Sequence, residues 1–461
     1  MPSIYISAAH KSSGKTTLSI GLVRALVERC VRVQPFKKGP DYIDPLWLSA
    51  AAGRACYNLD FYTQSRDEIS ERYINQQQDS DLALIEGNKG LYDGIDVAGS
   101  NSNAAMAVHL GTPVVLVINC RGMTRGIAPL LLGYQAFDPN IRIAGVILNQ
   151  VGGIRHQSKL IQVVEHYTDI PVLGAVQADP ELQIVERHLG LIPSNEEQSS
   201  EKLINKLAET AKTNVDLDRF LEIANGAELI GTASTQNPLN SERPYTGLKI
   251  GLARDEAFGF YYPDDLDRFR ESGAELLEFN TLKDRELPDV DGIFLGGGFP
   301  ETTMQQIESN PHMQQAIVGF IERGGPVYAE CGGLIYLTRS LSWQGKKCRM
   351  AGVIPADTVM HEKPQGRGYV RLSETGRSPW PTLGEGHQEI FAHEFHYSSL
   401  VGLKAQQDDY AYRVERGFGI DGKNDGYVYK NLLASYTHRR SVGGNNWVAR
   451  FLALVASVKN V

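Results

Sequence analysis

A single cysteine, Cys331, stands where a short apolar stretch with strand character meets a helical pattern. Gly332 and Gly333 follow it directly, and the apolar residues 334–337 continue as a helix. A cysteine on such a tight turn lies near the positive end of the helix, which favours a thiolate and offers backbone N–H groups to an oxyanion. Taken alone, the pattern fits two interpretations, a catalytic nucleophile and a buried structural thiol.

Two further features supply the other groups that acyl transfer needs. A run of three glycines about thirty residues before Cys331 can bring the bare N–H groups of Gly297 and Gly298 close to a reacting carbonyl. His438 is a candidate base, because a thiol needs a nearby imidazole to become a thiolate at neutral pH. Spacing alone does not select it among eleven histidines. The glycine run is also consistent with a flexible turn, and His438 with a structural histidine.

The second half of a phosphate-binding loop follows the first predicted strand. Gly14, Lys15, Thr16 and Thr17 open a helix, although Ala9 replaces the first glycine of the usual pattern. At such a helix start the backbone N–H groups cradle phosphates, the lysine meets the β- and γ-phosphates, and the first threonine hydroxyl binds Mg²⁺. The alternative is a helix start that binds no ligand. The flanking strand and helix favour nucleotide binding.

Two more polar segments follow apolar stretches. Residues 37–45 hold two lysines and two aspartates in a loop fixed by glycine and proline, and by composition alone a solvated turn explains them. Glu86 ends a strand and begins the glycine-rich residues 86–94, where a carboxylate beside a phosphate-binding loop suits Mg²⁺ or water. A turn capped by its acids is the alternative. Asn149 ends another strand and can contact a nucleotide base or serve ordinary turn chemistry.

The elements that carry these residues alternate between strand and helix. Such alternation predicts an α/β fold with a parallel sheet, in which ligands bind at the carboxyl ends of the strands. The first half is expected to contain a helix over about residues 15–29 and strands at residues 3–7, 82–85, 113–118 and 143–148. A second α/β pattern starts at Gly247, with strands at residues 248–253 and 292–295.

These patterns divide the chain into four segments. We expect a P-loop domain over residues 1–195, a helical extension and linker over 196–246, a second α/β domain over 247–445 and a C-terminal helix over 446–461. The linker is placed at residues 230–245, which are rich in Thr, Ser, Asn and Pro and lack an apolar period.

Composition excludes several classes of protein. The net charge of −8 gives no support for nucleic-acid binding, and no apolar run approaches membrane-spanning length. The five cysteines are scattered and form no CxxC pair, so neither a disulfide framework nor a zinc site is indicated. A reducing cytoplasm is the expected location.

Taken together, the motifs resemble the cobyrinate a,c-diamide synthase family over nearly the whole chain. The matching stretches are SGKTT at 13–17, KKGPDYIDP at 37–45, EGNKGLYDG at 86–94, ARDEAFGFYY at 253–262, GGGFPE at 296–301, AECGGLIYL at 329–337, HEFHYS at 393–398 and SYTH at 435–438. That family pairs an ATP-dependent amidoligase domain, related in fold to dethiobiotin synthetase, with a class I-like glutamine amidotransferase domain.

The resemblance implies a division of labour. Cys331 would be the glutaminase nucleophile activated by His438, with Gly297 and Gly298 near the oxyanion. The released ammonia would pass to the first domain, where ATP converts a tetrapyrrole carboxylate into an acyl phosphate that ammonia amidates. The implied ligands are ATP, glutamine, a tetrapyrrole and Mg²⁺, with no nucleic acid or membrane, and a homodimer stays open.

The resemblance also assigns roles in the first domain. The implied nucleotide-binding residues are Gly14, Lys15, Thr16, Thr17, Asp93 and Asn149. The implied substrate-binding residues are Asp41, Tyr42 and Ile43. The implied Mg²⁺ ligands are Thr16, Asp44 and Glu86.

The chain departs from the family pattern at several positions. Arg440 stands where ordinary class I amidotransferases have the triad glutamate, so we predict a Cys–His dyad. Ala9, Asn88 and Lys89 also differ from the family and bear on the substrate. Cobyrinate is the commonest family substrate, and sirohydrochlorin, sirohaem, hydrogenobyrinate and nickel-sirohydrochlorin are alternatives. A P-loop regulatory ATPase with a binding module, or an inactive amidotransferase scaffold, would be different in class, but Cys331 and His438 argue against both.

Overall fold

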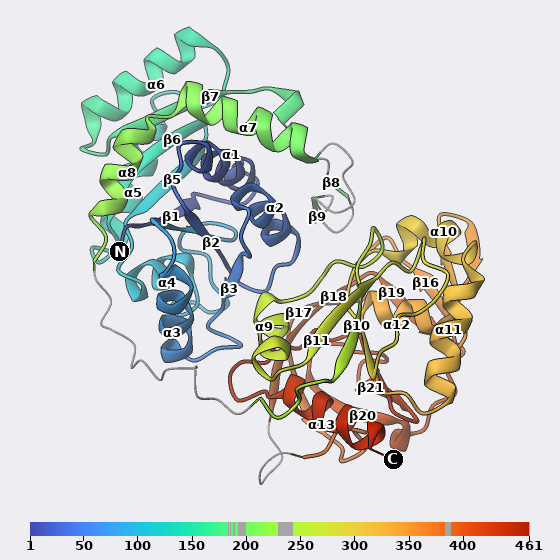
Figure 1. Ribbon diagram of the computed structural model, residues 1–461. Helices are drawn as coiled ribbons and strands as arrows, with labels where there is room; N and C mark the ends of the chain where they lie inside the picture. Colours follow the sequence, from blue (N-terminus) through green and yellow to red (C-terminus); the bar gives the residue numbers. More distant parts are fainter. Residues whose placement is uncertain are drawn as a thin grey trace. The chain divides into compact units, whose positions relative to one another are not determined.

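The protein forms two compact units, Met1–Gln236 and Asn237–Val461, each described here by itself. The computed structural model describes residues 1–182, 184, 186–187, 190–191, 200–228, 243–382 and 389–460 (Figure 1). Most of the expected linker at 230–245 and of the polar stretch before residue 200 lies outside these residues. Among the described helices, none is long and apolar enough to cross a membrane.

The first unit is built on a seven-stranded sheet of order β3-β2-β4-β1-β5-β6-β7. All of its strand pairs are parallel, as the alternation of strands and helices predicted. The strands are β1 (Ser3–Ala8), β2 (Val33–Lys38), β3 (Tyr57–Leu59), β4 (Leu82–Glu86), β5 (Val114–Asn119), β6 (Ile143–Val151) and β7 (Val172–Gln177). A separate two-stranded pair joins β8 (Glu186–Arg187) and β9 (Gly190–Leu191).

Helices cover both faces of this sheet, which buries its apolar side chains on either side. One face packs against α1 (Lys15–Glu28), α2 (Ile43–Ala52), α7 (Ser200–Asn214) and α8 (Leu217–Asn225). The other face packs against α3 (Arg66–Gln77), α4 (Asn103–His109), α5 (Ile127–Phe137) and α6 (Ile154–Tyr167). The parallel sheet with helices on both sides confirms the predicted fold class.

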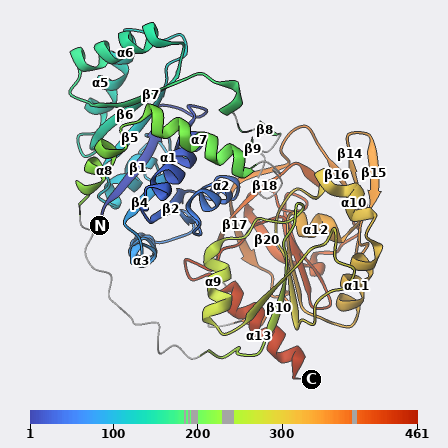
Figure 2. The same ribbon diagram turned by 45° about the horizontal axis from the view of Figure 1, so that its top comes forward.

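Helices α7 and α8 contribute to the core of the first unit. Their apolar residues Ile204, Leu207 and Phe220 are buried against the α1 face, and α7 runs beside α1 in both views (Figures 1 and 2). Gly21 permits this approach, because a Cβ at that position would lie 2.5 Å from the carbonyl oxygen of Leu207. The segment expected as an extension is therefore integral to the packing of the P-loop domain.

The second unit contains a mixed nine-stranded sheet of order β11-β10-β12-β13-β22-β21-β20-β17-β18. Its first five strands are parallel and the others pair antiparallel. The strands are β10 (Lys249–Ala253), β11 (Glu275–Phe279), β12 (Gly292–Leu295), β13 (Val327–Glu330), β17 (Gly366–Glu374), β18 (Ile390–His396), β20 (Tyr410–Arg416), β21 (Asn424–Tyr429) and β22 (Leu432–Ser435).

Helices again flank the large sheet. One face packs against α9 (Pro263–Glu271) and α13 (Trp447–Lys459). The other packs against α10 (Met304–Glu308), α11 (Pro311–Glu322) and α12 (Gly332–Leu337). A second sheet joins β15 (Lys346–Arg349), β14 (Thr338–Trp343), β16 (Ile354–Met360) and β19 (Ser398–Val401). The C-terminal helix α13 thus belongs to the core, where Trp447 meets Phe294 and Tyr328.

Candidate active site

Cys331 occupies a strained turn between β13 and α12. Its backbone has φ 45° and ψ −92°, a combination that L-residues rarely adopt. The Cys331 N–H donates to the carbonyl oxygen of Ser435 on β22 at 2.7 Å, which fixes the turn to the sheet. The side chain is 7% exposed. The sequence predicted this strand–turn–helix arrangement, which places the sulfur at the carboxyl end of the parallel strands.

Glycines allow the three-glycine loop to pack closely on this turn. A Cβ at Gly332 would lie 2.9 Å from the backbone nitrogen of Gly298, and a Cβ at Gly333 would lie 2.3 Å from the carbonyl oxygen of Leu295. A Cβ at Gly297 would lie 2.5 Å from Cε1 of His438. The loop that contains the two predicted oxyanion residues therefore contacts both the cysteine turn and the imidazole.

His438 joins the cysteine to a buried carboxylate. Its ring interacts with the Cys331 side chain, and its Nδ1 lies 3.3 Å from Oε2 of Glu330. Burial opposes a positive charge on this ring, but the bonds to Cys331 and Glu330 outweigh it and raise the pKa of His438 to about 10. A positively charged imidazole beside the sulfur favours the nucleophilic thiolate.

Glu330 is a candidate functional residue that the sequence analysis missed. It is 2% exposed, and its Oε1 accepts hydrogen bonds from the Tyr328 hydroxyl at 2.6 Å and the Arg439 N–H at 2.9 Å. These bonds fix its second oxygen toward His438. The predicted Cys–His dyad therefore has a carboxylate beside its imidazole, and this carboxylate comes from the residue before the nucleophile and not from position 440. The available signal was an acidic residue that ends an otherwise apolar strand.

Arg440, at the position expected for the triad acid, has a different partner. Its guanidinium donates to Oδ2 of Asp264 at 2.6 Å, and both side chains are buried. The pair links the chain after His438 to helix α9. Arg440 is therefore paired with α9, and the carboxylate beside the imidazole is supplied from β13.

The HEFH segment supports His438 from strand β18. The His438 N–H donates to the His393 carbonyl oxygen at 2.7 Å, and the His393 N–H donates back at 3.3 Å. Burial, followed by the nearby charge of His438, lowers the pKa of His393 to about 3. No group of three or more His, Cys, Asp or Glu side chains suited to a metal ion occurs in the described part of the chain. The observed role of His393 is the backbone pairing that holds His438 to β18.

In the first unit, the phosphate-binding loop ends at Gly14 before α1. Gly14 has φ 86°, and a Cβ there would lie 2.1 Å from Nδ2 of Asn149. That amide donates to the carbonyl oxygen of Ser13 at 2.9 Å, while the Thr17 hydroxyl donates to the carbonyl oxygen of Gly14 at 2.9 Å. We expected Asn149 to contact a nucleotide base. In the structure, it lies near the end of β6 and holds the phosphate-binding loop through its bond to Ser13.

Lys15 reaches the glycine-rich loop that follows β4. Its Nζ donates to the carbonyl oxygen of Lys89 at 2.6 Å, and the residue is 7% exposed. Burial and then the charge of Lys37 lower the pKa of Lys15 to about 8. Asp93 closes the same loop by accepting the Gly90 N–H at 2.9 Å. A lysine in these surroundings gains stability when an anion such as a phosphate arrives.

Two carboxylates and a hydroxyl converge beside this lysine. The Thr16 hydroxyl lies 2.7 Å from Oε1 of Glu86 and 3.2 Å from Oδ2 of Asp44. Lys37 Nζ contacts the same oxygens, at 2.9 Å and 2.5 Å. Oε2 of Glu86 is buried without a hydrogen-bond partner among the described residues, and burial raises the pKa of this carboxyl. Hard oxygens with one unsatisfied atom suit Mg²⁺, which keeps several waters.

The segment that carries the lysine pair differs from a solvated turn. Lys37 and Lys38 end strand β2 and are each 2% exposed. The loop interpretation was wrong here because proline and two lysines obscured a buried strand. Further on, the Asp41 carboxylate accepts the N–H groups of Ile43 and Asp44 at 2.9 Å and 3.1 Å. Burial and then the charge of Asp44 raise the pKa of Asp41 to about 7.

The other substrate residues of this loop lie at the start of α2. Tyr42 precedes the helix and is 9% exposed, and Ile43 is its first residue and packs against the core. The structure therefore brings the predicted nucleotide, substrate and metal residues to the carboxyl edge of one sheet. It brings Cys331, His438 and the glycine loop together in the other unit.

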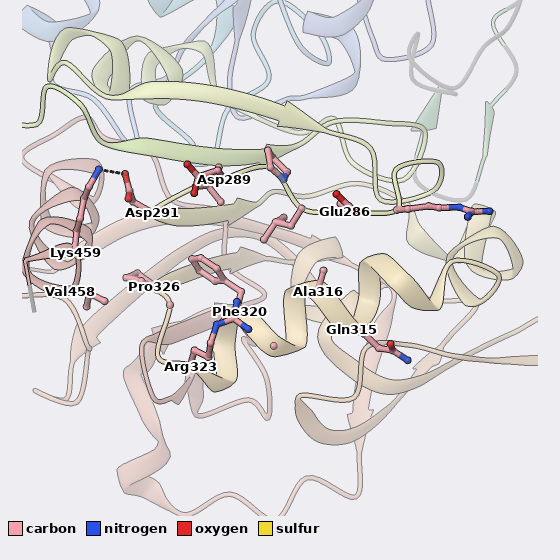
Figure 3. A pocket seen from close by; sticks show the side chains of 16 residues that line it. Glu286, Asp289, Asp291, Gln315, Ala316, Phe320, Arg323, Pro326, Val458 and Lys459 are labelled. Atoms are coloured by element: carbon pink, nitrogen blue, oxygen red, sulfur yellow. Dashed lines mark hydrogen bonds and ion pairs between the residues drawn. The ribbon is translucent and has the colours of Figure 1, made fainter.

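A surface cavity of about 540 Å³ lies in the second unit, away from these groups. Its lining includes residues just before β12 and β13, and Asp291 and Lys459 form an ion pair there at 2.8 Å (Figure 3). Cys331 follows the carboxyl end of β13, so the cavity lies at the opposite edge of the sheet. It is no part of the thiol site.

Comparison with known proteins agrees with this division. Residues 2–185 match an AAA domain family, and residues 249–445 match the CobB/CobQ-like glutamine amidotransferase domain. With the two sites described above, the fold defines a glutamine-dependent, amide-forming ligase that uses ATP as co-substrate.

The full-length relatives narrow the class to one family. A cobyrinate a,c-diamide synthase of Magnetococcus marinus is 44% identical over 98% of this chain and 97% of its own. Relatives of the same name from Archaeoglobus fulgidus and Methanosarcina acetivorans are 41% and 40% identical, over 98% and 96% of this chain and 97% and 93% of their own. The chain belongs to the cobyrinate a,c-diamide synthase family.

Proposed function

We propose that this ligase converts the a and c acetate carboxylates of a tetrapyrrole into amides, with cobyrinate as the substrate and glutamine as the source of ammonia. The observation that carries the proposal is the presence, in one chain, of the Cys331–His438–Glu330 constellation and of the phosphate-binding loop with Lys15. A chain that only regulated or bound a partner would need neither the cysteine–histidine–glutamate group nor a phosphate-binding lysine.

The second unit would hydrolyse glutamine. The Cys331 thiolate attacks the side-chain amide carbon, and the backbone N–H groups near Gly297 and Gly298 stabilise the oxyanion. His438 gives a proton to the departing nitrogen, so ammonia leaves and a thioester remains on the sulfur. Water then cleaves the thioester to glutamate and the free thiol. Glu330 keeps the imidazole oriented through both steps.

The first unit would use that ammonia. A carboxylate is a poor electrophile, so its oxygen first attacks the γ-phosphorus of ATP, and ADP leaves. Ammonia then attacks the carbonyl carbon of the acyl phosphate, and phosphate departs to leave the amide. Lys15 is placed to meet the phosphate charge, while Asp93 and Asn149 support the loops around it. Asp41, Tyr42 and Ile43 are the proposed contacts to the tetrapyrrole.

The proposal includes Mg²⁺ held by Thr16, Asp44 and Glu86. When bound, the ion would neutralise charge on the β- and γ-phosphates during transfer. Lys37 already contacts both carboxylates and would keep them in place around the metal. A cytoplasmic location stays a prediction, and so does assembly as a homodimer.

One assay tests the substrate assignment. The purified protein is incubated with ATP, Mg²⁺ and glutamine against cobyrinate, hydrogenobyrinate, sirohydrochlorin, sirohaem and nickel-sirohydrochlorin in parallel. Mass spectra in which two carboxylates of cobyrinate become amides would support the proposal. Diamidation of only sirohydrochlorin or sirohaem would identify that ring, and not cobyrinate, as the substrate. Amidation of none of the rings would overturn it.

A further inference from the structure

Lys38 is a buried cation that the proposed mechanism leaves unused. It is the last residue of β2 and 2% exposed. Among the described residues, none forms a hydrogen bond or ion pair with its ammonium group. Burying a charge without such a partner is costly, so the arrangement suggests a ligand that supplies the partner.

The strand directs Lys38 away from the proposed metal ligands. Neighbouring residues of a strand point to opposite faces of a sheet. Lys37 turns toward Glu86 and Asp44, so Lys38 turns to the face where Phe36 packs in the core beneath α3 and α4. The side chains of the two adjacent lysines therefore lie on opposite faces of the sheet, at the carboxyl end of β2.

Asp60 is the acid that acts most strongly on Lys38, and it only partly offsets the cost of burying the ammonium charge. Burial lowers the pKa of Lys38 to about 8, Asp60 opposes the shift, and Lys89 and Lys37 add to it. Asp60 is fully buried, and its carboxylate also accepts the Tyr62 N–H and the Thr63 hydroxyl, each at 3.3 Å. The surroundings of Lys38 thus have room for a further negative charge.

A second unsatisfied group lies beside Lys38. Oδ1 of Asn88 is buried without a hydrogen-bond partner among the described residues. The same side chain lies against Gly39, the residue after Lys38, because a Cβ on Gly39 would be 2.8 Å from Nδ2 of Asn88. A buried amide oxygen without a partner, next to an ammonium group without an ion pair among the described residues, indicates a site that is completed by a ligand.

The loop that carries Asn88 and Lys89 is held firmly. The Asn88 N–H donates to Oδ1 of Asn103 at 3.1 Å, and Nδ2 of Asn103 donates to the Gly90 carbonyl at 2.6 Å. Lys89 has φ 42° and an exposed side chain, and its carbonyl accepts from Lys15. The lysine side chain is therefore presented to solvent from a fixed backbone beside the phosphate-binding loop.

We propose that Lys38, Asn88 and Lys89 form a binding site for a carboxylate of the tetrapyrrole that does not react. The ammonium groups supply the charge, and the amide supplies a directional hydrogen bond. Because Lys38 turns to the opposite face of β2 from Lys37, which contacts Asp44 and Glu86, the site suits a substrate carboxylate better than a nucleotide phosphate. The inference rests on the proposed function and makes these three residues specificity determinants of the ring.

The test measures binding of the ring without turnover. Titration of the full-length protein with the accepted tetrapyrrole, followed by its visible absorbance, should give a Kd about 10- to 100-fold higher for Lys38→Met and a smaller rise for Lys89→Met. The KM for ATP and the glutaminase rate should not change. Lys159→Met, on the exposed surface of α6, is the matched control and should bind like the wild type.

A second binding experiment changes the ligand and not the protein. A ring whose non-reacting carboxylates are esterified should bind the wild type as weakly as the free acid binds Lys38→Met, and the variant should not distinguish the two ligands. Because Lys38→Met removes a buried charge, its melting temperature should equal or exceed that of the wild type. A lower melting temperature with unchanged ring affinity would show that Lys38 is structural.

Other outcomes separate this inference from the proposed function. A raised KM for ATP with unchanged ring affinity would assign the site to the nucleotide and refute the inference. If Lys38→Met and Lys38→Gln both bind the ring like the wild type while diamidation proceeds, the carboxylate site is wrong and the proposed function stands. If the wild type binds and amidates no tetrapyrrole, both are wrong.

Discussion

In both units the candidate reactive groups lie at the carboxyl ends of parallel strands. The two units differ in how the charges of these groups are compensated. In the second unit, the groups nearest Cys331 pair with one another: His438 interacts with Cys331 and Glu330, and Tyr328 and the Arg439 N–H donate to the Glu330 carboxylate. In the first unit, polar atoms of Glu86 and Asn88 remain without partners among the described residues. The candidate thiol, imidazole and carboxylate of the second unit are thus paired within the protein, although Nδ1 of His393 and Nε of Arg439 beside them lack partners in the described part of the chain. In the first unit, an oxygen of the candidate metal-binding carboxylate itself is left without a partner among these residues.

The pKa values show the same difference. Burial lowers the pKa of His438, but its interactions with Cys331 and Glu330 outweigh burial and raise the value to about 10. The pKa of Lys15 falls to about 8, because burial and Lys37 disfavour its charge. The imidazolium is thus stabilised within the protein, and the ammonium is stabilised when phosphate binds. Single substitutions should therefore disable the two sites one at a time.

Replacement of the nucleophile should separate the two units most strongly. Cys331→Ala should lower glutamine-dependent amidation by at least about 10³-fold, because no other group forms the thioester. Amidation with added ammonia should persist, since the first unit is unchanged. Both rates are read from product mass spectra, and a variant that still hydrolyses glutamine would show that the nucleophile lies elsewhere.

Replacement of the phosphate-binding lysine is the converse experiment. Lys15→Ala should lower amidation about 10²- to 10³-fold with glutamine or with ammonia, because the charge that meets the phosphates is lost. Glutamate release, measured separately, should continue. Amidation that falls with glutamine but survives with ammonia would contradict the assignment.

Replacement of the carboxylate beside the imidazole should have a smaller effect. Glu330→Gln should lower the glutaminase kcat about 10- to 100-fold, because the positive ring loses its anionic partner. The pKa of His438 should fall, so the upper limb of the pH–rate profile should move to lower pH. Asp264→Asn, which loosens the Arg440 pair away from the sulfur, is the comparison variant. An unchanged pH profile in Glu330→Gln would show that Cys331 and His438 act as a dyad without help from Glu330.

The pH dependence of stability should show the smallest effect. The pKa of His438 is raised from 6.5 to about 10 on folding, so its stabilising contribution is full below its unfolded value and is lost as the pH rises through about 10. The melting temperature of the wild type should therefore fall more steeply than that of His438→Gln over this alkaline range. Parallel curves for the two proteins would show that the imidazole is not held in its charged form.

Local patterns in the sequence were sufficient for much of this site. A cysteine between a strand and two glycines, and a Gly-Lys-Thr helix start, depend on neighbouring residues and were predictable. Glu330 and Lys37 were not, because each meets a partner from a distant part of the chain, His438 after β22 and Glu86 on β4. Position 440 was misleading for the same reason, since family spacing does not reveal which strand supplies the charge.

By itself, the sequence determined the α/β class, the order of the motifs and the chemical types of the reactive groups, because hydrophobic periodicity and turn chemistry are local. Only the tertiary structure decided which groups meet. It placed Glu330 on His438, gave Arg440 to Asp264, and turned Lys37 and Lys38 to opposite faces of β2. These pairings depend on sheet order and strand alternation, which bring distant residues together and decide which charges are compensated.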